Sequence, residues 1–401
     1  MNKILFFKQL FPYPIRSGTD ANTDSLLRFL SQDNEVHFVS LDDGNIVESD
    51  KSILEESIGK LSLIRPHNTR SRIEKYAYAI WNRIVAFIKG VPIAVQYLNT
   101  VPINKELHQL NEDHSHDVLV IAYWNALRKV KCFKNIPFKI AHLHDANFLD
   151  AKRRADISVD AVEKRKLAEL SRRLKDYEKN ALADFDRIIV QNPAEAKVYQ
   201  KLLPGKDVRV FPVLVDTDKI KPHSTGEESN LLLLGNFKHH PNVDSAHYVA
   251  RTILPQVRER NSDARLSIVG HHAKTELADL VGLDGVDVIG PVPNLQDVFC
   301  SHSVFVAPMR VGTGIKIKIL EAMAAGMAVV TNSLGAEALS VKSGQQLEIR
   351  DDAHGMSEVI ASLISDPQRR RLLGAAARKF IEDHHSANGV APLINSLYRP
   401  D

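Results

Sequence analysis

Short apolar runs alternate with helical patterns through almost the whole chain. This alternation is typical of parallel sheets whose two faces are covered by helices. In the first half the expected strands are Lys3 to Phe7, Val36 to Ser40, Val118 to Ala122, Phe138 to His142, Arg187 to Val190 and Val208 to Val213. In the second half they are Asn230 to Leu234, Arg265 to Val269, Val286 to Ile289, Val304 to Ala307 and Ala328 to Thr331. The sequence therefore predicts an α/β fold of two parallel-sheet units in tandem.

A polar segment separates the two series of strands. Residues 216–229 read DTDKIKPHSTGEES and contain Pro222 and Gly226, so we expect a hinge there. A chain of 401 residues is also too long for one ordinary core. We therefore expect a first domain over residues 1–220 and a second over residues 221–385.

Composition narrows the class of protein. Hydrophobic residues make up 44% and charged residues 25%, which is normal for a globular protein, and the net charge of +3 gives no signature of nucleic-acid binding. Cys132 and Cys300 lie far apart in apolar surroundings, so they indicate neither a disulfide framework nor a zinc site. There is no signal-peptide pattern and no apolar stretch near the roughly 18 residues that span a bilayer. We expect a cytoplasmic protein.

The stretch from Pro308 to Asn332 is the most informative for function. It reads PMRVGTGIKIKILEAMAAGMAVVTN, which predicts a glycine-rich turn, a helix from Gly314 to Ala325 and a buried strand. A glycine turn that opens a helix lets backbone N–H groups approach a phosphate closely. Lys316 and Lys318 suggest an anionic partner, and the carboxylate of Glu321 can accept hydrogen bonds from hydroxyls. The alternative is a plain turn, followed by an exposed ion pair between Lys318 and Glu321.

The run GTGIKIKILEAMAAGMAVVTN resembles the signature of the retaining, nucleotide-sugar-dependent glycosyltransferases of family 4, the group 1 glycosyl transferases. The resemblance implies the GT-B architecture, in which two Rossmann-like domains face each other across a cleft. It also implies that Glu321, which occupies the glutamate position of the family's LEAMA motif, binds the ribose hydroxyls of the donor. Gly312, Thr313 and Gly314 would then hold the donor diphosphate. In this family a C-terminal helix, here expected within residues 386–401, packs back on the first domain.

The sequence departs from the commonest form of this motif. Thr313 stands where a glutamate is usual, and the family's diphosphate-binding Arg and Lys are not evident in the run LLLLGNFKHHPN. A branch of the family carries G-[ST]-G-x-[RK]-x-K in this place, which makes Lys316 the substitute cation. Lys238 is a second candidate for the diphosphate, with a solvated loop lysine as the alternative.

Three residues of the first half are candidates for the other side of the site. Gly18 lies in the loop after the first strand, which resembles the family's loop facing donor phosphates and acceptor; a simple turn glycine is the alternative. His144 and Asp145 follow a strand in the run AHLHDAN, where family members often place a histidine near the donor sugar. They would contact the sugar as positive charge develops on its anomeric carbon. A structural histidine is the alternative.

The expected reaction is retaining transfer of a hexose-type sugar from a nucleotide diphosphate to a hydroxyl acceptor. The resemblance implies a carbohydrate or lipid-linked acceptor, a role in cell-surface polysaccharide or glycolipid synthesis, and catalysis by Lys316 and backbone amides without a metal or other cofactor. The histidine pairs at 239–240 and 271–272 have no carboxylate or cysteine at ligand spacing, so we expect no metal site there. The nucleotide base would lie against residues 290–294.

Two basic stretches raise the question of a membrane partner. Basic residues beside aromatic ones at residues 68–90 can hold a protein on an anionic membrane surface, so peripheral contact with the inner face is one interpretation. The run at residues 152–179 mixes acidic with basic side chains, which favours a solvated helix with ion pairs.

Three other functions remain as alternatives. A nucleotide-sugar 2-epimerase of the same architecture would need acid and base groups around the sugar. A dinucleotide-dependent oxidoreductase is disfavoured because FPYPIRSG follows the first strand in place of G-x-G-x-x-G. A catalytically inactive nucleotide-sugar-binding subunit is suggested by Thr313.

Overall fold

The computed structural model describes residues 1–15, 18–65, 72–88, 92–100, 103–113, 115–222, 229–312 and 314–400. The chain divides into two compact units, one made of Met1–Phe211 with Ala391–Asp401 and the other of Pro212–Val390. This division falls before the expected boundary at residue 220, because Val213 and Val215 are buried in the core of the second unit.

A seven-stranded sheet forms the centre of the first unit, with the order β3-β2-β1-β4-β5-β6-β7. All neighbouring strands in it pair in parallel. The order reverses between β1 and β4, and in open α/β sheets ligands bind outside the carboxyl ends of the strands at such a reversal. The strands are β1 (Lys3–Lys8), β2 (Glu35–Leu41), β3 (Gly59–Ile64), β4 (Val118–Ala122), β5 (Phe138–His142), β6 (Arg187–Val190) and β7 (Asp207–Val210).

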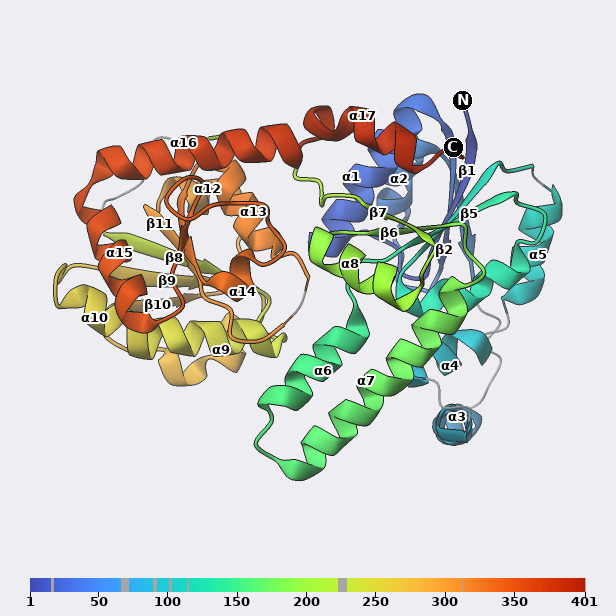
Figure 1. Cartoon of the computed structure of the whole chain (residues 1–401), viewed down its shortest axis with the longest axis horizontal. Coiled ribbons are helices and arrows are strands. Elements are labelled where there is room, and N and C mark those ends of the chain that lie inside the picture. Colours follow the sequence, from blue (N-terminus) through green and yellow to red (C-terminus); the bar gives the residue numbers. More distant parts are fainter. Residues whose placement is uncertain are drawn as a thin grey trace. The chain divides into compact units, whose positions relative to one another are not determined.

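Helices connect these strands, and α6 and α7 form a hairpin that projects from the body of the first unit (Figure 1). They are α1 (Gly18–Asp33), α2 (Glu48–Ile58), α3 (Arg72–Ile88), α4 (Ile93–Thr100), α5 (Asn104–Asp113), the 3-10 helix η1 (Trp124–Cys132), α6 (Asn147–Ile157), α7 (Ala161–Leu182) and α8 (Pro193–Leu202). A further helix, α17 (Ala387–Leu397), begins in the second unit and ends in the first.

The second unit is built on a six-stranded parallel sheet with the order β10-β9-β8-β11-β12-β13. Its strands are β8 (Asn230–Leu234), β9 (Arg265–Val269), β10 (Val286–Ile289), β11 (Val304–Ala307), β12 (Ala328–Thr331) and β13 (Glu348–Ile349). Its helices are α9 (His240–Tyr248), the π-helix η2 (Val249–Ile253), α10 (Leu254–Arg258), α11 (Ala273–Glu276), η3 (Ala278–Leu280), α12 (Leu295–Cys300), α13 (Ile317–Ala324), α14 (Ser333–Ala336), α15 (Ala353–Ser365) and α16 (Pro367–His384).

Both faces of the second sheet are covered, as the alternation in the sequence predicts. Leu231 and Leu233 of β8 belong to the core shared with α9, α10 and α15, whereas Leu232 and Leu234 belong to the core shared with α12, α13 and α16. Successive strand residues point to opposite faces, so one apolar run serves both cores. Figure 1 shows α9 and α13 on opposite sides of the sheet.

Every strand expected from the sequence is present, which confirms the prediction of two parallel-sheet units. The last expected strand of the first half is shorter than expected, because β7 ends at Val210. The sequence does not predict β3 or β13. The first is a half-exposed edge strand with little apolar signal, and the second has two residues.

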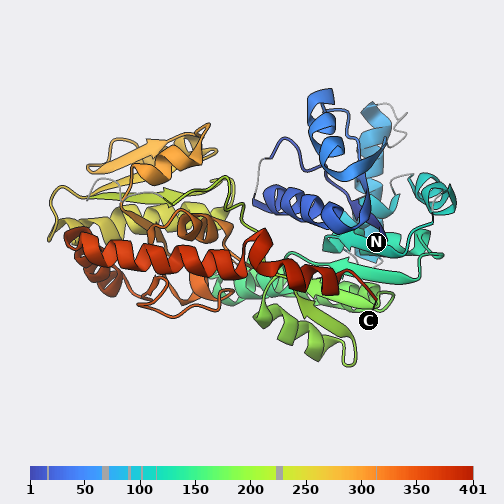
Figure 2. The same ribbon diagram turned by 90° about the horizontal axis from the view of Figure 1, so that it is seen from above.

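A buried arginine ties residues 391–400 to the first unit. The guanidinium of Arg187 in β6 donates hydrogen bonds to the carbonyl oxygens of Ser396, Leu397 and Arg399 at 3.0, 2.9 and 2.8 Å. Those carbonyls lie at the end of α17, where the last carbonyl oxygens of a helix have no N–H donors of its own. Figure 2 shows this red segment beside the strands of the first unit.

Candidate active site

The glycine turn of the second unit leads from β11 into α13. Gly312 and Gly314 have φ angles of 108° and 71°, which side chains other than glycine rarely adopt. The helix begins at Ile317 with Lys316 as its N-cap, and not at Gly314 as expected, because the left-handed backbone at Gly314 continues the turn. Gly326, with a φ of 75°, follows the helix as expected. Thr313 lies outside the described residues.

Two lysine side chains converge at this turn. The ammonium of Lys316, which is 9% exposed, donates a hydrogen bond to the carbonyl oxygen of Gly314 at 2.7 Å. The ammonium of Lys318 donates to Oδ1 of Asn242 in α9 at 2.9 Å. Burial, with a smaller contribution from the charge of Lys316, lowers the pKa of Lys318 to about 7. An anion bound here would favour the charged form of both side chains.

Glu321 lies one turn further along α13 and is half-buried. Burial raises the pKa of its carboxyl to about 7. Within the described part of the chain the carboxylate accepts no hydrogen bond, and the ammonium of Lys318 points to Asn242 instead of to Glu321. The surface ion pair that was the structural alternative is therefore absent between these two residues, and the carboxylate stays available for hydroxyl groups.

Lys238 lies on the loop between β8 and α9. Its ammonium pairs with the carboxylate of Glu276 at 3.1 Å, and the side chain is 60% exposed. Asn242, which holds Lys318, also donates to the carbonyl oxygen of Asn236 in the same loop. Asn242 thus links this loop to Lys318 at the start of α13. Lys238 itself has the surroundings of a solvated loop lysine.

In the first unit, four neighbouring strands each supply one side chain at their carboxyl ends. Lys8 ends β1, Tyr123 follows β4, His144 lies just after β5, and Gln191 follows β6. These strands are adjacent in the order β1-β4-β5-β6 and parallel, so their carboxyl ends meet at one edge. The cluster therefore lies where a ligand of this sheet would bind.

The side chains at this edge are stacked. The ammonium of Lys8 lies 5.4 Å from the ring centre of Tyr123 and pairs with the carboxylate of Asp20 at 3.2 Å. The rings of Tyr123 and His144 are 4.3 Å apart with an interplanar angle of 18°. His142 lies on His144 at 5.2 Å and 7°. The cluster is therefore a continuous layer of rings with one buried ammonium group at its end.

Tyr123 has an unusual backbone for a residue with a side chain. Its φ is 75° and its ψ is 140°. Such a conformation costs about 1–3 kcal/mol and persists only where the surroundings enforce it. Here it turns the ring of Tyr123 onto His144, which points to a site whose geometry is held at the expense of stability.

Two further contacts hold the histidines. The hydroxyl of Tyr398 lies 3.0 Å from Nδ1 of His142, and Nε2 of Gln191 lies 2.8 Å from Nδ1 of His144. Burial lowers the pKa of His144 well below its usual value, and His142 and Lys8 lower it further. His144 is therefore a neutral imidazole at physiological pH.

The other two residues expected on this side lie close by in the chain. Asp145 is exposed directly before α6, and its carbonyl oxygen accepts a hydrogen bond from the Asn147 amide. Gly18 is the first residue of α1, whose first turn supplies Asp20 to Lys8. The structure thus brings the Gly18 helix and His144 to the same edge of the sheet.

Sequence reasoning missed Lys8, Tyr123, Gln191 and Tyr398 in the first unit and Asn242 in the second. Lys8 and Gln191 each stand at the end of an apolar run, which is a weak sequence signal for a site residue. Their proximity, however, depends on the strand order, which local sequence does not show.

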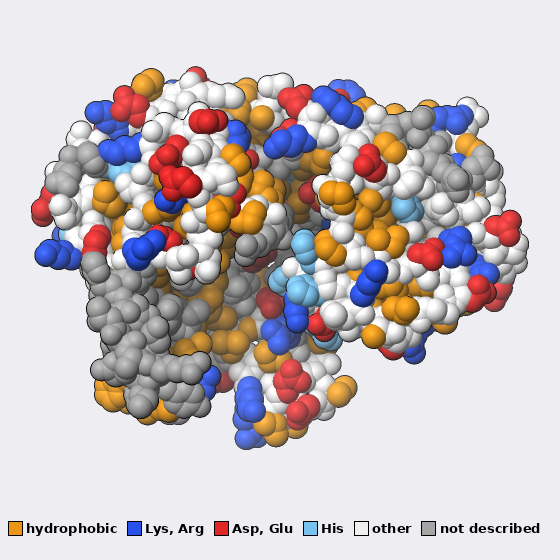
Figure 3. Space-filling model, turned by 180° about the vertical axis from the view of Figure 1, so that it is seen from behind, with side chains coloured by type: hydrophobic (Ala, Val, Ile, Leu, Met, Phe, Trp, Pro, Cys, Tyr) orange, Lys and Arg blue, Asp and Glu red, His pale blue; other side chains and the backbone are white. Residues whose placement is uncertain are grey.

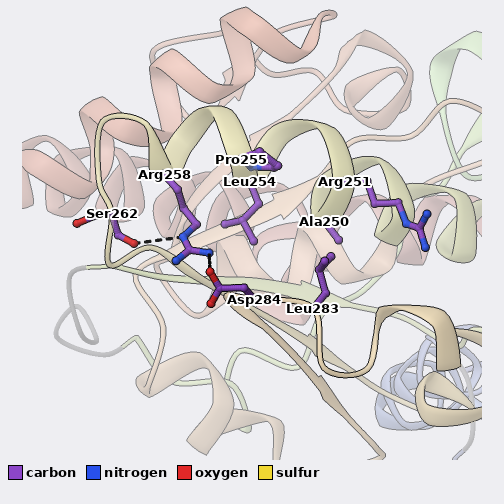
Figure 4. Close-up of a pocket in the computed structure, with 8 residues that line it drawn as sticks. All are labelled: Ala250, Arg251, Leu254, Pro255, Arg258, Ser262, Leu283 and Asp284. Atoms are coloured by element: carbon purple, nitrogen blue, oxygen red, sulfur yellow. Dashed lines mark hydrogen bonds and ion pairs between the residues drawn. The ribbon is translucent and has the colours of Figure 1, made fainter.

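Other features of the surface lie apart from these residues. A pocket of about 450 Å³ in the second unit contains none of the predicted site residues, and its Arg258 and Asp284 pair with each other at 2.7 Å (Figure 4). Acidic and basic side chains are interspersed over the face shown in Figure 3. Among the described residues, no three His, Cys, Asp or Glu side chains are grouped to hold a metal ion.

Residues 228–366 match the family model described as Glycosyl transferases group 1. This match includes the glycine turn and α13. The chain is 26% identical over 170 residues to an uncharacterized 44.6 kDa protein in the cps region of Klebsiella pneumoniae, covering 40% of this chain and 44% of the relative. It is 27% identical over 172 residues to the lipopolysaccharide core biosynthesis mannosyltransferase LpcC of Rhizobium leguminosarum, covering 41% of this chain and 49% of that relative. The chain thus spans less than half the length of these relatives.

Solved structures match over the whole length. Sucrose-phosphate synthase from Thermosynechococcus elongatus has a TM-score of 0.71 at 15% identity, covering 100% of this chain and 98% of that one. HepE from Anabaena, in complex with UDP, has a TM-score of 0.66 at 13% identity, covering 98% and 100%. The two parallel-sheet units therefore have the GT-B glycosyltransferase fold, as expected.

Proposed function

We propose that this chain is a retaining glycosyltransferase that moves a hexose-type sugar from a nucleotide diphosphate to a hydroxyl group. The observation that carries the proposal is the presence of two shielded lysines and a half-buried carboxylate where the glycine turn leads into α13, within the residues that match group 1 glycosyl transferases. Phosphate and ribose of a donor need these two chemistries side by side.

The donor diphosphate would bind the backbone of Gly312, Thr313 and Gly314 together with Lys316, and its ribose would bind Glu321. A Cβ at Gly312 would be in van der Waals contact with Pro241 at 3.7 Å, and the φ of 108° disfavours any side chain there. Lys318 adds a second ammonium group that sequence reasoning had not assigned to the donor. Lys238 is the remaining candidate for the diphosphate.

In the first unit His144 and Asp145 would face the sugar, with Gly18 on the loop before α1. Catalysis would consist of stabilising the departing diphosphate by Lys316 and backbone amides, with no metal ion or other cofactor. The buried ammonium of Lys8, paired with the carboxylate of Asp20, lies at the same strand edge. The acceptor would be a carbohydrate or lipid-linked hydroxyl in polysaccharide or glycolipid synthesis, and the place of action cytoplasmic.

Peripheral contact with the inner membrane face is supported by helix α3. Ile80, Trp81, Ile84 and Ile88 are exposed at 47%, 61%, 46% and 75%, and Arg83 is exposed among them. In the described part of the chain no helix is long and apolar enough to cross a bilayer. Sedimentation with anionic phosphatidylglycerol vesicles should carry down the protein and leave Trp81→Ser in solution. Equal sedimentation of both proteins, or of neither, would exclude this contact.

The test of the proposed activity is a thermal-shift series with UDP-, GDP-, ADP- and dTDP-sugars, each with and without magnesium. A ligand that binds only the folded protein must raise its melting temperature. One nucleotide family should give a magnesium-independent rise, which Lys316→Met should abolish and the exposed control Lys342→Met should keep. A rise that survives Lys316→Met would refute the assigned donor site. Turnover with the selected donor, followed by NMR of the anomeric proton, then tests transfer and retention.

A further inference from the structure

The first unit contains a positioning residue for His144. We propose that Gln191 fixes His144 as a neutral imidazole with its proton on Nε2, so that His144 serves the reaction as a hydrogen-bond donor and not as an acid or base. The proposal rests on the proposed function only in assigning His144 to the sugar. The state of the ring itself follows from the contacts around it.

The first step is the direction of one hydrogen bond. Nε2 of Gln191 is an amide nitrogen, which only donates, and it lies 2.8 Å from Nδ1 of His144. Nδ1 must therefore carry a lone pair, and in a neutral ring the proton is then on Nε2. Because both side chains are more than nine-tenths buried, water does not compete for this hydrogen bond.

Gln191 is held rigidly enough to set the tautomer. It follows β6 directly, and Asn192 after it caps α8 by accepting a hydrogen bond from the Glu195 amide at 2.9 Å. The strand and the helix cap thus fix the backbone on both sides of Gln191. His144 is fixed in turn by contact with the rings of Tyr123 at 4.3 Å and His142 at 5.2 Å.

The charges that face His144 keep the ring uncharged. Lys8 from β1 and His142 from β5 both disfavour an imidazolium, and burial does so most strongly. The carboxylate of Asp20 on α1 is paired with Lys8. Asp145, the next residue in the sequence, is exposed. Burial raises the pKa values of Tyr123 and Tyr398, so these two hydroxyl groups stay neutral.

A neutral His144 ring with its proton on Nε2 allows hydrogen-bond donation but not proton abstraction. It can donate a hydrogen bond from Nε2 to an oxygen of the sugar in both ground and transition states. It cannot take a proton from carbon, because Nδ1 is occupied and protonation is opposed by Lys8 and His142. The contacts therefore favour group transfer over the epimerase chemistry that needs a histidine base.

The test is nitrogen-15 NMR of histidine-labelled full-length protein, in which the His144 signals are identified by their loss in His144→Gln. Gln191→Glu replaces the donor by an acceptor of the same shape. It should move the proton to Nδ1 and raise the pKa of His144, so that the ring titrates between about pH 5.5 and 8. The matched control is Gln109→Glu, since Gln109 is exposed on α5.

In the wild type and in Gln109→Glu we expect the Nε2–H tautomer, unchanged across this pH range. Turnover of Gln191→Glu should fall at least about tenfold, while its thermal shift with the donor nucleotide stays that of the wild type. A wild-type ring that titrates, or that carries its proton on Nδ1, would overturn the proposal even if the variant failed to fold. Absence of turnover in the wild type would refute the proposed function alone, because the NMR result does not depend on activity.

Discussion

Glu321 and Lys318 lie on one face of α13 and respond to pH in opposite directions. The pKa of Glu321 is raised to about 7, so its carboxyl gains a proton as the pH falls below neutrality. The pKa of Lys318 is lowered to about 7, so its ammonium loses a proton as the pH rises above neutrality. In the proposed donor site the carboxylate binds hydroxyls and the ammonium binds phosphate, so donor binding should be strongest near pH 7.

Calorimetry with an intact sugar nucleotide measures this directly, since the charge of its diphosphate is constant in this range. The dissociation constant should rise on both sides of neutrality, toward about tenfold per pH unit at the limit. Glu321→Gln should remove the acidic branch and leave the alkaline one, whereas Lys318→Met should do the reverse. A flat profile in the wild type would contradict the assignment of both residues.

Whether a site can be predicted from the sequence depends on how far apart its residues lie in the chain. Gly312, Lys316 and Glu321 lie in one short run, so the local pattern alone suffices to propose a phosphate site, with a plain turn as the alternative. Gln191 and His144 are far apart in the sequence, and only the pairing of β5 with β6 makes them neighbours. The left-handed backbone of Tyr123 has no sequence signal either, because tertiary packing enforces it.

A buried carboxyl group on α7 should make the first unit lose stability as the pH rises. Burial raises the pKa of Glu178 from 4.5 to about 8, and Tyr199 donates a hydrogen bond to its Oε2 at 2.6 Å. Between these values the unfolded chain is ionised while the folded protein keeps its proton, so stability falls with rising pH. Glu178→Gln should remove this part of the slope.

Chemical unfolding at several pH values checks this prediction. The gain in unfolding free energy of Glu178→Gln over the wild type should be near zero below pH 4.5 and grow up to about pH 8. Glu163→Gln, an exposed position on the same helix, should show no such trend. A constant difference across the range would mean that Glu178 is already ionised in the folded protein.

A close approach of two glycines fixes α16 against the end of α13. A Cβ placed on Gly374 would lie 1.9 Å from the carbonyl oxygen of Gly326. Gly374→Ala must therefore push α16 away from the turn that ends α13, at a cost of about 1–3 kcal/mol. Gly290→Ala is the control, since its Cβ would meet nothing within 4 Å. Denaturant unfolding of both variants tests this, and equal stability would exclude the close contact.

The elements themselves were largely predictable, for a physical reason. Strands buried on both faces, such as β8 with its run of leucines, need continuous apolar sequence. The prediction that α13 begins at Gly314 was wrong, because the local sequence pattern does not distinguish a left-handed glycine turn from the first turn of a helix. Gly314 looks helical in sequence, but its φ of 71° keeps it in the turn.

At the scale of the whole molecule, the first unit depends on a segment that follows the second in sequence. A chain that ends at Val390 would leave the buried guanidinium of Arg187 without three carbonyl partners and His142 without Tyr398. We expect the first unit to lose at least about 2 kcal/mol of unfolding free energy. The second unit, which holds the glycine turn, should still bind the nucleotide.

Two probes separate these effects. Both tryptophans, Trp81 and Trp124, lie in the first unit, so tryptophan fluorescence during urea unfolding reports on that unit alone. The nucleotide thermal shift reports on the second. Loss of the thermal shift together with an unchanged fluorescence transition would contradict the division of roles between the units.

The discontinuity of the first unit also bears on the order of events during translation. The second unit is a continuous segment, Pro212–Val390, and can complete its fold once it has left the ribosome. The first unit starts earlier but lacks the partners of Arg187 until Ala391–Asp401 emerge. The nascent chain would therefore have a folded second unit, with the proposed nucleotide site, before it has a finished strand edge around His144. The proposed sugar transfer would then have to wait until residues 391–401 have left the ribosome.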